Sequence, residues 1–565
     1  MRARKYARIP HSRGPLTVFP PIIFLVAAVI LSLRAKAAEE NLAARVVLLA
    51  NSEDPDSLRV ARHYAEVRGV PLENIIALKL PLAESITWRE FVVTLWEPLL
   101  DELLRAKWVD AIPMALTDPV GRRKLAVQGH RIRALVTCRG VPLKIEHDPA
   151  LYLGSPFTQR AEFRTNAGAV DSELSLLAQP NYPINAFVPN PLFQKENPDA
   201  LERLQVVRVS RLDGPSVEDA LGLVDRAVAA ERTGLLGRAY VDMGGIHAAG
   251  DRWLEALAIQ LESLRWAPAV DRDPATLSAT ARCDAPVLYF GWYASNLNGP
   301  FALPGFRFPP GAIALHIHSY SAGTLRSTMA GWAGPLVARG VTATVGNVFE
   351  PYLEQTHRPD LFFRALARGA MLVDAAYFSL PEFSWQAILI GDPLYRPFAV
   401  SLETQLQTLA TVPPRLTSYA VLRRVNAWVA SGRRDEALAL ALARSTQRTV
   451  PSLALGLVLS RLLSEAGDDE SAANALGFVS LLKALPTDEW ALAREAALQL
   501  ERLGHPVRAL ELWRRILATE SLPRELRVAW LPEARRAANA AVDLAQAIEW
   551  ERALADLAGP PPDRK

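Results

Sequence analysis

Two histidines and two serines alternate in the segment HIHSYSAG (316–323), which directly follows the apolar residues 311–315. Residues i and i+2 of a strand point to the same face, so the imidazoles of His316 and His318 could bind one metal ion. The candidates for a third ligand are Asp242, His247, Glu350 and His357. The alternative is that both histidines end a strand and hydrogen-bond to the backbone, because a lone H-x-H is a weak motif.

A second interpretation makes Ser319 or Ser321 a nucleophile, with His318 or His316 as its base. Neighbouring residues of a strand point to opposite faces, so His318 is poorly placed to activate Ser319. Neither serine lies in the G-x-S-x-G turn that exposes the nucleophile of α/β hydrolases. The alternative is that the serines satisfy the turn after a strand.

Acidic and aromatic residues follow other strand-like segments, and parallel sheets bind ligands beyond the carboxyl ends of their strands. We therefore expect a pocket lined by Trp292, Tyr293, Asp54, Asp242, Glu350 and Asp392. VDSEL (170–174) adds further carboxylates at the edge of an insertion. Each has a structural alternative: a helix cap in DPDS (54–57), a turn in GDP (391–393) and core packing for the two aromatic residues.

These residues depend on a scaffold of alternating apolar and amphipathic segments between about residues 45 and 400. The expected strands are 46–50, 75–80, 132–138, 204–210, 238–243, 287–294, 312–320, 341–348 and 387–390. The expected helices are 57–69, 87–107, 216–232, 251–265, 332–339 and 359–378. Such alternation predicts an α/β domain whose mostly parallel sheet is flanked by helices. Residues 147–203 are polar and rich in proline, which indicates a long insertion.

After about residue 415 the pattern becomes almost wholly helical. Gly432, Gly467 and Gly504 are 35 and 37 residues apart, close to the length of a helix–turn–helix repeat. Small or apolar residues follow these glycines at the fifth and ninth positions: Ala437, Ala472, Ala509, Ala441, Leu476 and Trp513. The region resembles tetratricopeptide repeats, which implies a protein partner; an ordinary helical bundle is the alternative.

The N-terminus has the pattern of an export signal. Five basic residues precede the apolar run 18–33, and Ala35-Lys36-Ala37 matches a cleavage site, so we expect cleavage after Ala37 and an exported protein, periplasmic or secreted. An uncleaved membrane anchor is the alternative. The net charge of +3, from 63 basic and 60 acidic residues, argues against a nucleic-acid partner. Cys138 and Cys283 are too few for a cysteine-only zinc site, and their pairing stays open.

Several segments between residues 45 and 400, among them VVLLANSEDPDSLRVARHYAEVRGVP, GNVFEPYLEQTH and SWQAILIGDPLYRPF, resemble an uncharacterised family of exported bacterial proteins. The chain also resembles gingipain-type cysteine peptidases, which implies a caspase-like fold. The shared order of segments is SRLDGPSVEDALGLVDRAVAAE, then two apolar strands, then a final GDP. In that family a His-Gly ends one strand and the nucleophilic Cys ends the next. Here these strands end in Gly291-Trp292-Tyr293 and in His318-Ser319-Tyr320-Ser321, so both catalytic residues are missing.

Together these patterns predict four parts: a signal peptide (1–37), a caspase-like α/β domain (38–400), a linker (401–415) and a helical repeat domain (416–565). We expect a non-catalytic protein of the cell envelope that needs no cofactor and binds a protein through its repeats. The alternative is a hydrolase that uses a metal at His316 and His318 or a nucleophile at Ser319 or Ser321. Either reading requires the segments that end at Trp292 and Ser321 to lie side by side.

Overall fold

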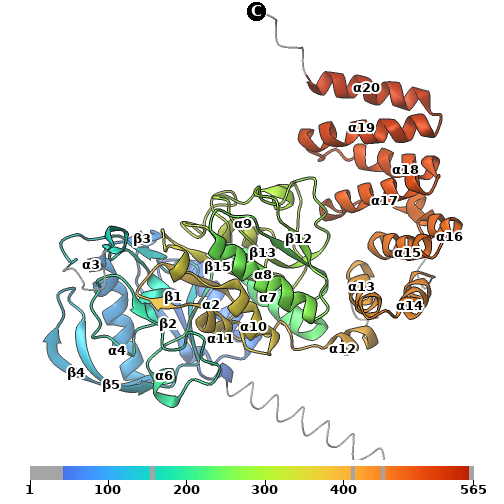
Figure 1. The fold of residues 1–565 in the computed structure, drawn as a ribbon. Coiled ribbons are helices and arrows are strands. Elements are labelled where there is room, and N and C mark those ends of the chain that lie inside the picture. Colours follow the sequence, from blue (N-terminus) through green and yellow to red (C-terminus); the bar gives the residue numbers. More distant parts are fainter. Residues whose placement is uncertain (1–41, 153–159, 409–413, 447–451, 559–565) are drawn as a thin grey trace, which may run out of the picture.

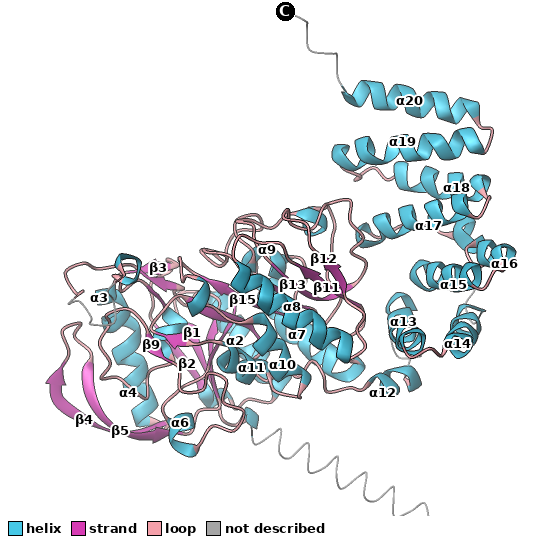
Figure 2. Ribbon diagram, in the orientation of Figure 1, coloured by secondary structure: helices cyan, strands magenta, loops and turns pink. Residues whose placement is uncertain are grey.

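The computed structural model describes residues 42–152, 160–408, 414–446 and 452–558 (Figure 1). The predicted signal peptide at residues 1–37 lies outside these ranges. Among the described residues, no helix has the length and apolar character needed to cross a membrane. An α/β part is followed by a row of stacked helices (Figure 2).

The α/β part is built on a ten-stranded sheet in the order β12-β11-β13-β14-β15-β17-β10-β6-β1-β2. The strands are β1 (Val46–Asn51), β2 (Ile75–Leu78), β6 (Ala134–Cys138), β10 (Val209–Leu212), β11 (Arg238–Asp242), β12 (Ala269–Asp271), β13 (Pro286–Gly291), β14 (Ile313–His316), β15 (Ala343–Asn347) and β17 (Ala387–Gly391). Pairs are parallel from β12 to β15 and from β10 to β2, whereas β15 and β17 pair antiparallel. The prediction of an α/β fold with a mostly parallel sheet is confirmed.

Helices cover the sheet, and for this reason its strands are apolar on both faces. All six residues of β1 and of β13 are buried. The main covering helices are α2 (Pro55–Arg68), α4 (Glu97–Arg105), α7 (Val217–Thr233), α8 (Ala248–Ser263), α9 (Ala333–Ala338), α10 (Pro359–Ala367) and α11 (Leu372–Ser379). The expected cap at Ser216 is confirmed, because its hydroxyl accepts from Asp219 N–H and the Asp219 carboxylate accepts from Ser216 N–H.

Several predicted elements differ from the structure, among them the strand predicted for 287–294, which ends at Gly291. The segment 204–210 is a strand only from Val209, because α6 (Ala200–Leu204) occupies its start. The helix predicted for 359–378 is two helices, interrupted at Gly369, whose φ is +90°. The strand predicted for 312–320 ends at His316, so the serines that follow lie in a loop. The antiparallel hairpin of β4 (Val109–Thr117) and β5 (Arg123–His130) was not expected.

The helical part consists of stacked antiparallel helices (Figure 1). Its elements are α13 (Pro414–Ala430), α14 (Arg434–Thr446), α15 (Leu453–Glu465), α16 (Asp469–Asn474), α17 (Trp490–Arg502), α18 (Pro506–Leu517), α19 (Arg524–Ala540) and α20 (Leu544–Ala558). Gly432, Gly467 and Gly504 separate paired helices with φ of +79°, +84° and +78°, a conformation that glycine adopts without strain. The small or apolar residues five and nine positions later are all buried. The predicted helical repeats are therefore present.

Buried polar contacts join the two parts. The Asp284 carboxylate, at the start of the segment leading into β13, accepts a hydrogen bond of 2.8 Å from the Tyr419 hydroxyl of α13. The Asp488 carboxylate, before α17, accepts one of 2.9 Å from Ala285 N–H. Arg282 forms a further ion pair of 3.1 Å with Glu495. These contacts fix the start of the helical stack against the α/β part.

Candidate functional site

The candidate site lies where β13, β14 and β15 end, an edge called here the carboxyl edge. β13 and β14 are neighbouring parallel strands, and Gly291 pairs with His316 in register. The segments that run into Trp292 and into Ser321 therefore lie side by side and point the same way, as expected. The structure thus brings together the two strand ends on which the predicted chemistry depends.

His316 is buried, and both of its ring nitrogens have partners. Nε2 accepts a hydrogen bond of 2.9 Å from Ala294 N–H, so the proton must be on Nδ1, which lies 3.0 Å from the Tyr289 hydroxyl. The ring stacks on Trp332 with 3.5 Å between centroids. Burial, helped by nearby His318, lowers the pKa of His316 well below its ordinary value. His316 is therefore a neutral residue held within the core.

A short relay of hydrogen bonds links His316 to Asp242. The Tyr289 hydroxyl donates to Asp242 Oδ2 over 3.0 Å, and Leu277 N–H donates to the same oxygen. Burial raises the pKa of Asp242 to about 6, and its Oδ1 is buried without a partner. The predicted Asp242 thus lies at the carboxyl edge, where its carboxyl group contacts Tyr289 and reaches His316 only through that hydroxyl.

His318 lies apart from this relay. Its ring faces Tyr293 at 4.4 Å between centroids, and its Nδ1 is 2.6 Å from the carbonyl oxygen of Ser319. Because β14 ends at His316, the strand alternation that would bring both imidazoles to one metal does not extend to His318. Within the described ranges, no three His, Cys, Asp or Glu side chains are grouped to hold a metal ion. The metal site therefore stays a prediction. To bind a metal ion, His316 would have to give up one of its two hydrogen-bond partners.

The two serines have different surroundings, and neither hydroxyl is bonded to a histidine ring. The Ser319 hydroxyl donates to the Glu350 carboxylate, which also accepts from Tyr352 N–H. Ser321 is buried; its Oγ accepts from Asn347 N–H over 3.0 Å. Its carbonyl oxygen also accepts from two backbone N–H groups, so this serine shapes the turn that precedes α9. The predicted Ser319 and Glu350 thus form a pair, whereas Ser321 holds the backbone.

Other predicted residues divide between this edge and more distant positions. Trp292 is buried and its Nε1 donates to Asp251 over 2.8 Å, whereas Tyr293 is 38% exposed beside His247. Asp54 caps α2 by accepting from Asp56 N–H, which agrees with the alternative of a helix cap.

Asp392 is not part of the site, which corrects the predicted pocket. It follows β17, which is antiparallel to β15, so Gly391 pairs with Ala343 at the start of β15 rather than at its end. Its buried carboxylate accepts from the Tyr64 hydroxyl over 2.9 Å and contacts Arg68. The sequence could not reveal this, because it does not specify the direction of the final strand.

Neither cysteine supplies a thiolate to the carboxyl edge. Cys138 ends β6 and Cys283 precedes β13, and both are free and buried. Burial, with Asp213 as a further cause, raises the pKa of Cys138, and burial likewise raises that of Cys283 well above its usual range. A protonated, buried thiol is a poor nucleophile.

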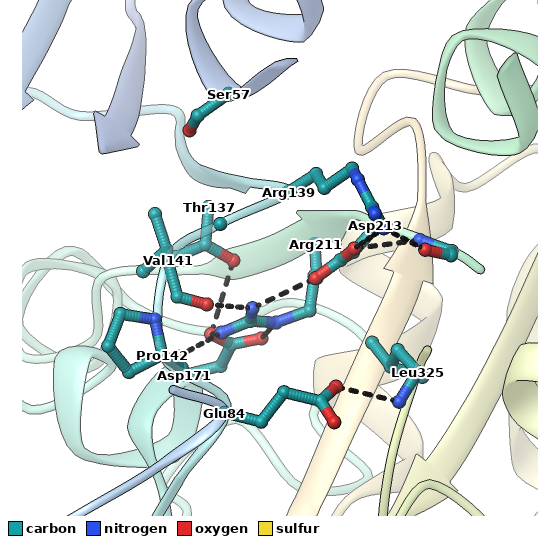
Figure 3. A network of polar contacts seen from close by, with 12 residues as sticks. Ser57, Glu84, Thr137, Arg139, Val141, Pro142, Asp171, Arg211, Asp213 and Leu325 are labelled. Carbon is teal, nitrogen blue, oxygen red and sulfur yellow. Dashed lines mark hydrogen bonds and ion pairs between the residues drawn. The ribbon is translucent and has the colours of Figure 1, made fainter. Parts of the chain in front are cut away.

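A buried arginine that was not predicted from the sequence lies beside this edge (Figure 3). Arg211, near the end of β10, donates from Nε and Nη2 to both carboxylate oxygens of Asp171 over 2.9 and 2.6 Å. It also donates to the carbonyl oxygens of Val141 and Pro142, each over 2.8 Å. The sequence contains both partners, an acid in the VDSEL segment and an arginine in the SRLDG segment. It does not show that the two segments meet.

The loop that follows β14 is fastened to elements beyond β6 and β10. Lys144 Nζ donates to the carbonyl oxygen of Gly323 over 2.8 Å. Leu325 N–H donates to the Glu84 carboxylate, also over 2.8 Å (Figure 3). Arg326 forms an ion pair with the buried Asp213. The loop that holds Ser319 and Ser321 is thus anchored by charges from three other segments.

Comparison with solved structures finds two that are similar to part of this chain. Two crystal structures of a kinesin light chain from Podosopora anserina with nearly identical TPR-like repeats are similar to this chain, the second being a single-residue variant of the first. Each is 20% identical with a TM-score of 0.20, and the match covers 28% of this chain and 83% or 82% of the other. No family model and no curated protein matches the chain. So low a TM-score does not support a shared arrangement, and the repeats are identified from the geometry of this chain.

Proposed function

We propose that this chain is an exported protein of the cell envelope in which a caspase-like domain without peptidase activity carries a protein-binding module of helical repeats. The observation that carries the proposal is the state of His316. It ends the strand beside Gly291, and both of its nitrogens are bonded inside the protein. In the described part of the chain no Ser, Thr or Cys side chain is bonded to its ring, and the hydroxyl that is, that of Tyr289, donates to Asp242.

The missing nucleophile and base are the physical basis for the lack of peptidase activity. Covalent catalysis needs a nucleophile within hydrogen-bond reach of a base. At this edge Ser319 reaches only Glu350, and both cysteines are buried elsewhere. A carboxylate alone is a weak base for an alcohol, so we expect no turnover of peptides.

The helical part supports the proposal of a protein partner. Stacked helical repeats present extended surfaces that commonly bind other proteins. Here the α19 and α20 pair ends the stack, and apolar side chains remain exposed near it, among them Val542 at 79% and Leu544 at 61%. Export is proposed from the basic and apolar pattern of residues 1–37 and is tested by sequencing the mature N-terminus.

One observation favours a hydrolase as the second candidate. Ser319 is half-buried and its hydroxyl already donates to the Glu350 carboxylate, which in this alternative takes the hydroxyl proton as the oxygen attacks a bound substrate. This alternative predicts hydrolysis that depends on Ser319 and Glu350. The proposal of a non-catalytic domain predicts none.

The deciding experiment incubates the purified protein with peptide and ester substrate libraries. The Ser319→Ala variant is compared with Ser327→Ala, a serine in the same loop that contacts only nearby backbone N–H groups. We expect no turnover above buffer from any of the three proteins. Turnover that Ser319→Ala abolishes and Ser327→Ala retains would establish the hydrolase instead. Elemental analysis of protein prepared without chelator tests the metal version of that alternative.

A further inference from the structure

A cavity of about 860 Å³ opens at the other end of the strands from the candidate site. Arg45, Arg133 and Arg208 line it, and each directly precedes a strand: β1, β6 and β10 respectively. These strands are parallel neighbours in the sheet, so the three arginines form a row along its edge, called here the amino edge. The volume falls within the range of small-molecule sites, roughly 300 to 1,000 Å³.

Positive charge dominates the cavity. Seven of its lining residues are Lys or Arg, whereas only Glu196 and Asp374 are acidic. Two arginines share the carboxylate of Asp374. Arg133 Nη1 donates to its Oδ1 over 2.9 Å, and Arg208 Nε lies 3.3 Å from the same oxygen. Glu196 is paired with Arg368. Lys195 forms an ion pair of 2.9 Å with Glu202, outside the lining. Arg45, Arg203 and Arg364 have no carboxylate of their own among the lining residues.

The excess of positive charge also changes the pKa values of the residues in this row. Burial lowers the pKa of Arg208 below its ordinary value, and the single Asp374 offsets this only in part while Arg133 adds to it. For Asp374, burial opposes ionisation, but Arg133 and Arg208 still bring its pKa below the usual range. A row of cations held this close without matching anions favours an anionic ligand.

Two buried polar atoms in the lining lack partners. Arg364 Nε is buried without a hydrogen bond, although its guanidinium lies 5.2 Å from the centroid of the Phe378 ring. His130 donates from Nε2 to the carbonyl oxygen of Val206 over 3.0 Å, which leaves its buried Nδ1 as an unused acceptor. Buried polar groups are normally satisfied, so these atoms point to a ligand that supplies both an acceptor and a donor.

We propose that this cavity binds a small organic anion that carries phosphate groups, held by the row of arginines at the amino edge together with the lining cations Arg203 and Arg364. Guanidinium groups bind phosphate oxygens in a bidentate manner, and several phosphate charges would match the excess of cations. Leu192, Leu204 and Phe378 add apolar lining for the organic part of the ligand. The phosphate comes from a soluble compound or from a lipid headgroup, and the experiment separates these sources.

The test titrates the full chain with inorganic pyrophosphate at constant ionic strength by isothermal titration calorimetry. The test variant, Arg203→Gln with Arg364→Gln, removes two lining cations. The control variant, Arg62→Gln with Arg232→Gln, removes two exposed cations that do not line the cavity. We expect saturable binding that weakens about tenfold or more in the test variant and stays unchanged in the control. If the double variant does not fold, Arg203→Gln alone, at an exposed position, replaces it.

Flotation with vesicles of phosphatidylglycerol and phosphatidylcholine in equal amounts identifies the source. Vesicle binding that pyrophosphate displaces, and that the test variant loses, assigns a lipid headgroup; pyrophosphate binding without vesicle binding assigns a soluble phosphorylated compound. The proposal is overturned if neither probe binds, if both variants lose binding equally, or if vesicle binding survives in the test variant.

Discussion

Arg208 and Arg211 lie at the two ends of the same short strand, β10, and their surroundings differ in one decisive respect. Every donor of Arg211 has an acceptor: two carboxylates and two backbone carbonyl groups surround it. Arg208 shares the carboxylate of Asp374 with Arg133 and faces a cavity. Both side chains are well buried, so what separates them is whether their hydrogen bonds are satisfied.

This difference distinguishes a structural arginine from a candidate ligand-binding one. A buried ion pair whose hydrogen bonds are complete rigidifies the elements that it joins, here β10 and the VDSEL helix, α5 (Val170–Leu174). A buried cation with incomplete partners retains binding capacity, which a ligand can use. At the carboxyl edge both nitrogens of His316 are bonded inside the protein and Asp242 Oδ1 is buried without a partner, whereas the excess of positive charge lies at the amino edge.

The largest expected effect comes from Arg211→Met. The substitution leaves the Asp171 carboxylate buried without its partner, and breaking a buried pair in this way costs about 3–5 kcal/mol. Urea unfolding of the variant measures the loss in the free energy of unfolding. A loss below about 1 kcal/mol would show that the network does not stabilise the fold and would remove the contrast with Arg208.

Replacing both partners sharpens the same contrast. Arg211→Met combined with Asp171→Leu removes the uncompensated charge, and apolar replacements of whole buried pairs are often tolerated. We expect a loss of about 1–3 kcal/mol, smaller than that of Arg211→Met alone, because the carbonyl groups of Val141 and Pro142 still lose their donor. A double variant less stable than the single one would contradict the charge argument.

Acidification should weaken the side of the molecule near the carboxyl edge. Burial lowers the pKa of His357 to about 3, and the adjacent Thr356 hydroxyl donates to Asn347 at the end of β15. The unfolded chain binds a proton near pH 6.5 whereas the folded chain does not until about pH 3, so stability is complete above 6.5 and falls below it. From pH 6.5 to 5 this histidine alone accounts for about 2 kcal/mol.

Urea unfolding at a series of pH values, with His357→Asn for comparison, measures this slope. The variant should lose part of the dependence, and the remainder should come from His316, whose pKa burial also lowers. An identical slope in wild type and variant would mean that His357 is protonated in the folded protein.

The smallest effect is expected from Arg208→Gln. Removing this guanidinium relieves its repulsion with Arg133, which keeps Asp374 as a partner, so the free energy of unfolding should change by about 1 kcal/mol or less. Thermal unfolding measures the change. A loss as large as that of Arg211→Met would place Arg208 among the structural arginines and remove the distinction between the two ends of β10.

Much of the scaffold was predictable because it follows from local patterns. The run VVLLA formed a buried strand, Ser216 capped α7, and the spaced glycines of the C-terminal region each separated two helices. Ser319 and Glu350 were named from the sequence and do contact each other. The predictions that failed concern where a strand ends and in which direction it runs, because a local pattern specifies neither. The examples are the segment after His316 and the strand before Asp392.

The sequence by itself determined the α/β alternation, the helical repeats and the lack of a cysteine in the segments that end at Trp292 and Ser321, since each depends on residue type and spacing along the chain. Only the tertiary structure decided that His316 is closed off by Tyr289, Trp332 and a backbone N–H. It also decided that three arginines far apart in sequence form one row at the amino edge. The reason is physical: the satisfaction of a buried polar group depends on neighbours that strand order and direction bring together, and a single sequence does not encode these in any local pattern.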